Sequence, residues 1–89
     1  MYSRNGQHSR PKMLRAYVLI ETEQGTAIDV AESIAGIEGV ATACAVNGPY
    51  DVIALAEAAD IDDLCQAIVG KIQTVDGITR TLTCPTVRT

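Results

Sequence analysis

The chain of 89 residues is poor in aromatic side chains, with three Tyr and neither Phe nor Trp. Its core must therefore be built from Ile, Val, Leu and Ala, and it offers no aromatic platform on which nucleic-acid bases could stack. Basic residues are also few: seven Lys and Arg stand against eleven Asp and Glu, for a formal net charge of −4. Those in the body, Arg15, Lys71, Arg80 and Arg88, are widely separated. These absences argue against unaided binding of nucleic acid.

Side chains that support catalysis or metal binding are scarce. The single histidine, His8, lies in a polar N-terminal stretch, and Cys44, Cys65 and Cys84 form no CxxC pair. The sequence has no Gly-rich phosphate-binding loop and no carboxylate pair with an obvious base partner. We therefore expect no catalytic residue, no metal site and no cofactor. The cysteines are expected to be small, buried, apolar residues.

Long hydrophobic runs are missing as well. No run approaches the length of a membrane span, and none near the start has the form of a signal-peptide core with a cleavage site. With 47% hydrophobic and 20% charged residues, the composition is that of a globular domain. We expect one domain, located in the cytoplasm, and self-association is a natural source of stability for a chain this short.

What is present begins with a polar segment. Residues 1–12 contain Gly6 and Pro11, carry several basic residues and show no apolar periodicity. This pattern predicts a flexible N-terminal arm over 1–12, followed by a domain over 13–89.

The first half of the domain predicts a strand, a helix and a strand. Residues 14–21 form a short apolar run rich in strand-forming side chains. After Gly25, Thr26 is expected to cap a helix. Residues 40–46 follow as the second strand. The apolar helix positions recur at spacings of three and four: Ala27, Val30, Ala31, Ile34 and Ile37.

The second half repeats this order after a turn. Residues 47–50 predict the turn because Asn and Gly tolerate positive φ. Residues 51–57 then form a strand, Asp60 caps a second helix, and 78–84 form the last strand, with Pro85 expected to stop its pairing. The expected buried stripe of the second helix is Ile61, Leu64, Cys65, Ile68 and Ile72.

A faint internal repeat organises these elements. Residues 34–42 (IAGIEGVAT) align with 72–80 (IQTVDGITR). Two interleaved βαβ units predict an α+β, ferredoxin-like βαββαβ fold, with a four-stranded antiparallel sheet and two helices on one face. The other face stays open, and we expect it to pack against the sheet of a second subunit.

The motifs Gly48-Pro49-Tyr50-Asp51 and Thr81-Leu82-Thr83, in this order among the elements, carry a family resemblance. Over residues 14–87 the chain resembles the RAM (regulation of amino-acid metabolism) domain, the effector-binding half of the Lrp/AsnC family of bacterial and archaeal transcription regulators. The resemblance implies a dimer built by sheet packing, of the dimeric α/β-barrel type. It further implies a ring of dimers, commonly an octamer, that binds amino acids in clefts between dimers.

Carried over residue by residue, the resemblance implies ligand-binding roles for Gly48, Tyr50, Asp51, Thr81 and Thr83. Gly48 would let a ligand carboxylate approach backbone N–H groups, Asp51 could accept from an α-ammonium, and Tyr50 could supply an amphipathic wall. A structural explanation stands beside this one. Gly48 could serve a tight turn, Tyr50 an oligomer contact, and Asp51 a bond to neighbouring backbone N–H groups.

The chain departs from full-length members of the family, which carry an N-terminal helix-turn-helix that a twelve-residue arm cannot form. We therefore expect a stand-alone effector-binding and oligomerisation module, with neither nucleic acid nor membrane as a direct partner. One alternative is a ligand-free assembly partner that co-oligomerises with full-length regulators. The other, a small enzyme on the same fold, is the least favoured because the residues supply no catalytic set.

Overall fold

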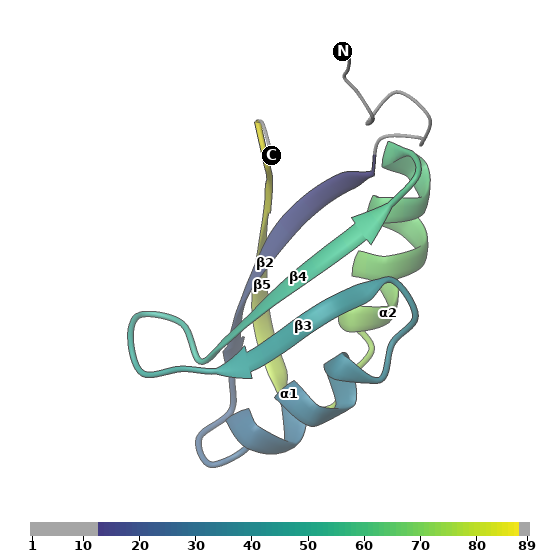
Figure 1. Ribbon diagram of the computed structural model, residues 1–89. Helices are drawn as coiled ribbons and strands as arrows, with labels where there is room; N and C mark the ends of the chain where they lie inside the picture. Colours follow the sequence, from purple (N-terminus) through teal and green to yellow (C-terminus); the bar gives the residue numbers. More distant parts are fainter. Residues whose placement is uncertain (1–12, 88–89) are drawn as a thin grey trace.

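The computed structural model describes residues 13–87. Its elements are β2 (Leu14–Thr22), α1 (Ala27–Ala35), β3 (Val40–Ala45), β4 (Val52–Ala58), the π-helical segment η2 (Asp63–Val69), its short continuation α2 (Gly70–Ile72), and β5 (Ile78–Pro85). The four strands form one antiparallel sheet in the order β3-β4-β2-β5 (Figure 1). The expected ferredoxin-like α+β fold is confirmed. The expected arm over 1–12 lies outside the described residues.

The core lies between one face of the sheet and the helices. Because side chains alternate along a strand, β2 and β4 each bury every second residue on this face. Helix α1 packs mainly on β3 and β4, whereas η2 packs on β4 and β2, so β5 lies at the margin of the covered area. The residues that make up the core are Ala16, Val18, Ile20, Val30, Ala31, Ile34, Val52, Ala54, Ala56, Ala58, Leu64, Ile68, Val69 and Ile72.

The two expected helix caps differ in outcome. Asp60 caps the second helix as predicted, because the backbone N–H of Asp63 donates to Asp60 Oδ1 at 2.9 Å. Thr26 precedes α1 but makes no side-chain cap bond. Its hydroxyl donates instead to the carbonyl oxygen of Glu23 at 2.7 Å, which closes the turn before the helix. The expected position of the cap is confirmed, since Thr26 is the N-cap residue of α1, but the expected side-chain bond is absent.

The second helix is wound differently from the expected α-helix. Leu64, Ile68 and Ile72 are buried as predicted, but Ile61 is 51% exposed and Cys65 is also exposed. For Cys65 the reason is the π-helical winding of η2, which places more residues in each turn than an α-helix does, whereas Ile61 lies before η2. The buried residues therefore differ from those predicted at α-helical spacing, and Val69 belongs to the core.

Two further expectations need correction. Cys44, Cys65 and Cys84 are all exposed in this chain, so the prediction that they are buried is wrong for the single chain. Pro85 does not stop the pairing of the last strand, because it is still opposite Ala16 in the sheet. Pro85 has no N–H to donate. The next residue, Thr86, donates its N–H to the carbonyl oxygen of Arg15 at 2.9 Å.

The internal repeat is visible in the structure as a reciprocal contact. Gly39 and Gly77 occupy equivalent positions of the repeat, and both have left-handed backbones, with φ of 98° and 97°. A Cβ on Gly39 would collide with Ile68 of the second unit, and a Cβ on Gly77 would lie 3.1 Å from Val30 Cγ2 of the first. Val30 and Ile68 are separated by the same 38 positions as Gly39 and Gly77. Each unit thus presses its helix against the glycine turn of the other.

Candidate functional site

The connection between β3 and β4, residues 46–51, projects beyond the sheet (Figure 1). Gly48 lies there with no atom within 4 Å of the place a Cβ would take, and its φ is outside the left-handed region. The turn explanation based on positive φ is therefore wrong for Gly48. No contact within the described part of the chain requires glycine at this position. Tyr50, two residues on, is half-buried.

Asp51 anchors the base of this loop to the neighbouring strand. Its Oδ2 accepts the backbone N–H of Thr22 at 2.8 Å, and its own N–H donates to the carbonyl oxygen of Ile20 at 2.9 Å. The carboxylate thus holds β2 at the point where the β2–β5 register shifts, between Glu21 and Thr22. Asp51 has the structural role considered above, and a carboxylate retains further acceptor capacity beyond this one bond.

Thr81 and Thr83 lie on β5, on the face that the helices cover elsewhere. The sheet register pairs Thr81 with Ile20 and Thr83 with Val18, whose side chains are fully buried. Because β5 is at the margin of the covered area, both threonines remain only partly buried. Thr81 Oγ1 accepts a hydrogen bond from Gln73 Nε2 at 3.1 Å.

The five predicted ligand-binding residues come from two separate places in the sheet. Asp51 precedes β4, Thr81 is on β5, and β2 runs between these two strands. Two inter-strand spacings separate their backbones by roughly 10 Å, and the Asp51 carboxylate spans part of this distance through its bond to the N–H of Thr22 on β2.

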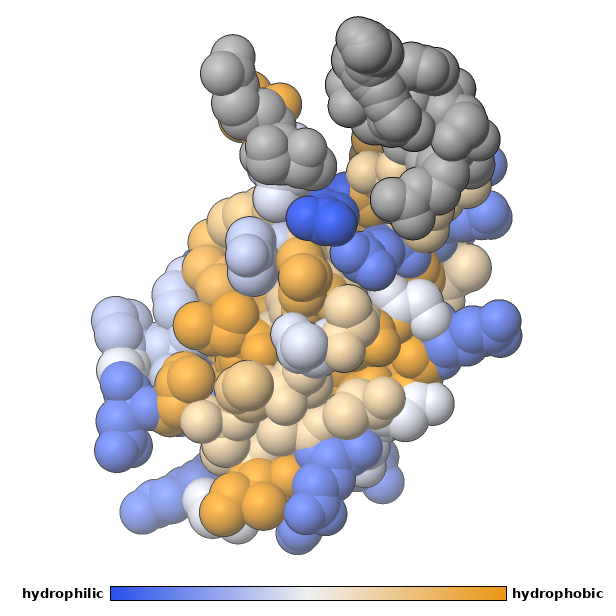
Figure 2. Space-filling model, in the orientation of Figure 1, coloured by the Kyte–Doolittle hydropathy of each residue, from blue (hydrophilic) through white to orange (hydrophobic). Residues whose placement is uncertain are grey.

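The sheet face away from the helices, here called the open face, carries two apolar rows across all four strands. The register aligns Cys44, Ile53, Leu19 and Leu82 in one row, and Thr42, Leu55, Tyr17 and Cys84 in the other. In the view of Figure 2, apolar residues fill the middle of the surface and hydrophilic residues surround them. Tyr17 and Leu82 are 46% and 48% exposed. An exposed apolar surface rimmed by polar residues is typical of an interface.

Charged residues border the open face at both ends. At one end Arg15 Nε lies 2.9 Å from Glu57 Oε2, which joins β2 and β4. At the other end Glu21 is opposite Arg80 in the β2–β5 ladder. An apolar centre with a charged rim is the usual anatomy of a protein–protein interface.

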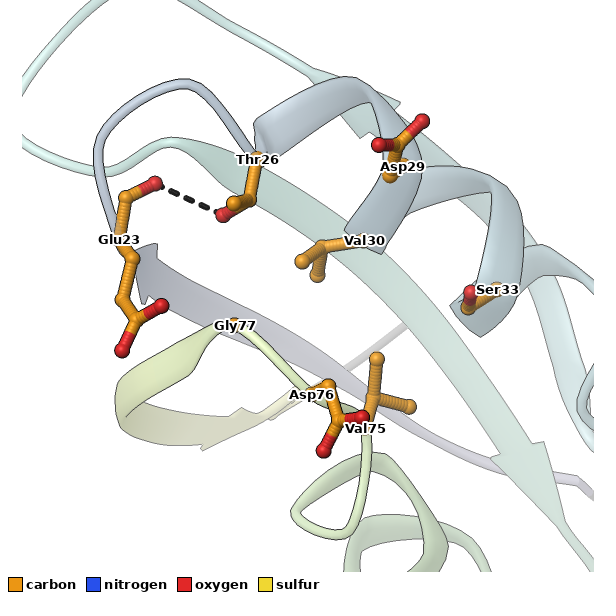
Figure 3. A pocket seen from close by; sticks show the side chains of 8 residues that line it. All are labelled: Glu23, Thr26, Asp29, Val30, Ser33, Val75, Asp76 and Gly77. Atoms are coloured by element: carbon orange, nitrogen blue, oxygen red, sulfur yellow. Dashed lines mark hydrogen bonds between the residues drawn. The ribbon is translucent and has the colours of Figure 1, made fainter.

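A groove of about 460 Å³ opens on another part of the surface, between the start of α1 and the turn before β5. A groove at this place was not predicted from the sequence. Figure 3 shows Val30 and Val75 facing it from opposite sides, with carboxylates of α1 and of the turn around them. The backbone N–H of Glu23 donates to the carbonyl oxygen of Gly77 at 2.7 Å and fixes the two sides together. Its lining residues are Glu23, Thr26, Asp29, Val30, Ser33, Val75, Asp76 and Gly77.

The charge of this groove limits what it can bind. Glu23, Asp29 and Asp76 contribute three carboxylates and no basic residue is among its lining, so it repels the carboxylate of a free amino acid. The sequence signal for it is the Asp76-Gly77 pair, which predicts a turn and nothing more. Within residues 13–87 no group of His, Cys, Asp and Glu is arranged to hold a metal ion. No helix in this part of the chain is long and apolar enough to cross a membrane.

Comparison with known proteins defines the class. The family model described as "Lrp/AsnC ligand binding domain" matches residues 15–89. The chain therefore belongs to the Lrp/AsnC ligand-binding domain family, which confirms the resemblance found in its sequence. No curated protein matches the chain.

Solved structures support the same assignment. The protein TTHA0845 from Thermus thermophilus is 32% identical over 85% of this chain and 95% of that one, with a TM-score of 0.77. AsnC of E. coli is 19% identical, with a TM-score of 0.78, and the match covers 93% of this chain but 56% of AsnC. A transcriptional regulator from Neisseria meningitidis, solved with L-Met, is 14% identical with a TM-score of 0.75, over 99% of this chain and 58% of that one. The last two similarities bear on the fold alone.

Proposed function

We propose that this chain is an effector-binding and assembly module that binds an amino acid or a related small molecule at an interface between its own copies. The observation that carries the proposal is the match of residues 15–89 to the Lrp/AsnC ligand-binding domain. Catalysis is no part of the proposal.

Two features of the chain agree with binding between copies. The open face offers an apolar surface with a charged rim, which suits a sheet-to-sheet dimer. The loop with Gly48, Tyr50 and Asp51 is separated by β2 from Thr81 and Thr83 on β5, which agrees with a site that a second chain completes. Dimers joined in this way could close into a ring such as an octamer.

Calorimetric titration with each of the twenty protein amino acids tests the proposal, with the assembly mass measured in solution before and after. We expect saturable heat with at least one of them and a mass of a dimer or a multiple of it. A monomer that binds none of the twenty would refute the proposal. Assembly without binding would favour a ligand-free partner of full-length regulators, which mixing with such a regulator and measuring mixed oligomers would reveal.

The groove provides a control for the location of the site. Asp76→Asn removes one groove carboxylate, whereas Asp51→Asn removes the charge at the base of the loop. We expect the Asp51 variant to weaken amino-acid binding and the Asp76 variant to leave it unchanged. The opposite result would move the site to the groove.

A further inference from the structure

The covered face of the sheet is apolar on β2 and β4 but carries threonines on β5, at the margin of the sheet. On β2 and β4 this face is apolar and fully buried, as at Val18, Ile20 and Val52. On β5 the positions in register with Ile20 and Val18 are threonines, and both are partly exposed. A hydroxyl in such a place is not needed to fill the core, and it is accessible to a ligand.

Gln73 lies directly after α2 and reaches across to this strand. Its Nε2 donates to Thr81 Oγ1 at 3.1 Å, a side-chain bond between the end of the helix and the middle of the last strand. A threonine hydroxyl has one O–H to donate and two lone pairs to accept. With one lone pair engaged by Gln73, the O–H of Thr81 remains available to donate outward.

We propose that Gln73 is a positioning residue of the effector site, which sets the Thr81 hydroxyl as a donor to the carboxylate of the bound amino acid. This inference rests on the function proposed above, because Thr81 enters it as a ligand-binding residue. It assigns the ligand's carboxylate to the β5 part of the site, in place of the backbone N–H groups at Gly48 considered above. A donor aimed at a carboxylate favours an amino acid over its carboxamide, since hydrogen bonds to ionised acceptors are the stronger ones.

The substitution Gln73→Glu tests the direction of this hydrogen bond. An ionised Glu can only accept, so the Thr81 hydroxyl would turn to donate to it and present lone pairs to the ligand. The new negative charge would also repel the ligand's carboxylate. We expect the affinity for the amino acid to fall about tenfold or more, the loss of one charge-assisted hydrogen bond. The carboxamide can donate to the lone pairs of Thr81, so its affinity should change much less.

The chain offers a matched control in Gln66, an exposed residue of η2 on the same helical segment. Gln66→Glu introduces the same charge without a bond to Thr81, and we expect it to keep the preference of the wild type. Thr81→Val removes the hydroxyl. If Gln73 acts through Thr81, adding Gln73→Glu to Thr81→Val should cost less than Gln73→Glu does in the wild type.

The probes are the twenty protein amino acids, followed by the carboxamide of the one that binds most tightly. Affinities come from calorimetry, and thermal melting checks that each variant is folded. If the wild type binds no amino acid, the proposed function fails and this inference fails with it. If the wild type binds but Gln73→Glu behaves as Gln66→Glu, the effector function stands and the role of Gln73 is refuted. Equal weakening for acid and carboxamide would reveal a merely structural effect and also overturn it.

Discussion

Asp51 makes a structural hydrogen bond and also places a negative charge at the base of the projecting loop. The substitution Asp51→Asn separates the effect of the bond from that of the charge. Its Oδ2 accepts the N–H of Thr22 at 2.8 Å, and the amide oxygen of an Asn could accept the same bond without the charge. We expect Asp51→Asn to change the free energy of unfolding by less than about 1 kcal/mol, the scale of one hydrogen bond. Its affinity for the amino acid should fall about tenfold or more. Urea denaturation and calorimetry measure the two effects.

Asp51→Ala completes this comparison. It leaves the partly buried N–H of Thr22 without its partner, so it should lower both stability and affinity. If Asp51→Asn binds the amino acid as tightly as the wild type, the carboxylate serves the fold alone.

The backbone requires glycine at position 77 but not at position 48. Substituting alanine at each position tests this difference. A Cβ on Gly48 meets nothing within 4 Å, whereas Gly77 has φ of 97° and a Cβ would lie 3.0 Å from Thr26 Oγ1. We expect Gly48→Ala to change the unfolding free energy by no more than about 0.5 kcal/mol. Gly77→Ala should cost about 1–3 kcal/mol of backbone strain. Equal destabilisation in urea would show that Gly48 also serves the fold.

At the scale of elements, the winding of the second helix determines which of its residues are buried. Leu64 is 1% exposed, and the adjacent Cys65 is exposed on the π-helical segment. We expect Leu64→Ala to cost about 2–5 kcal/mol, because it leaves a cavity in the core. Cys65→Ala should be close to neutral. Thermal and urea denaturation of the two variants measure this difference, and an α-helix burying both residues would instead give a clear loss for each.

The strands were predictable from the sequence because their signals are local. A short apolar run rich in strand-forming side chains, ended by the polar residues 22–25, predicted the first strand over 14–21, and β2 is Leu14–Thr22. The Asp60 cap followed from residue type alone. The π-helical winding of η2 has no signal in the apolar spacing of the sequence, so Cys65 was misplaced. The groove was missed because its sides come from segments about 50 residues apart, between Glu23 and Gly77.

The candidate site was less predictable than the fold. The resemblance supplied its five residues, but sequence spacing could not show that β2 lies between Asp51 and Thr81. Nor could it show that Gln73 reaches Thr81, because that bond depends on how the turn after α2 brings the helix end over the sheet.

For the whole molecule, the repeat explains why one face is covered and the other is not. Each βαβ unit places its helix on the same side of the interleaved sheet, and the Gly39–Ile68 and Gly77–Val30 contacts hold the two units together there. The opposite side receives no helix from either unit within the described residues. Its apolar rows must then be covered by another molecule or remain in water, and the first outcome is favoured by the area removed from water.

The reactivity of the three cysteine thiols shows whether the open face is covered by another molecule, without any substitution. Cys44 and Cys84 lie in the two apolar rows of the open face, whereas Cys65 lies on the helical side of the chain. All three are exposed in a single chain, so a monomer should react with iodoacetamide at each. A sheet-to-sheet dimer buries the first two and leaves Cys65 free. We therefore expect native protein to take up one label per chain quickly, at Cys65, and denatured protein to take up three.

Leu82→Asp provides the control for this experiment, because a carboxylate at the β5 end of an apolar row opposes burial of the open face. In this variant the solution mass should fall to that of a monomer, and Cys44 and Cys84 should react as fast as Cys65. Peptide mapping by mass spectrometry assigns each label. Rapid labelling of Cys44 and Cys84 in the native wild type would contradict pairing through the open face. Protection of Cys65 instead would place the contact on the helices.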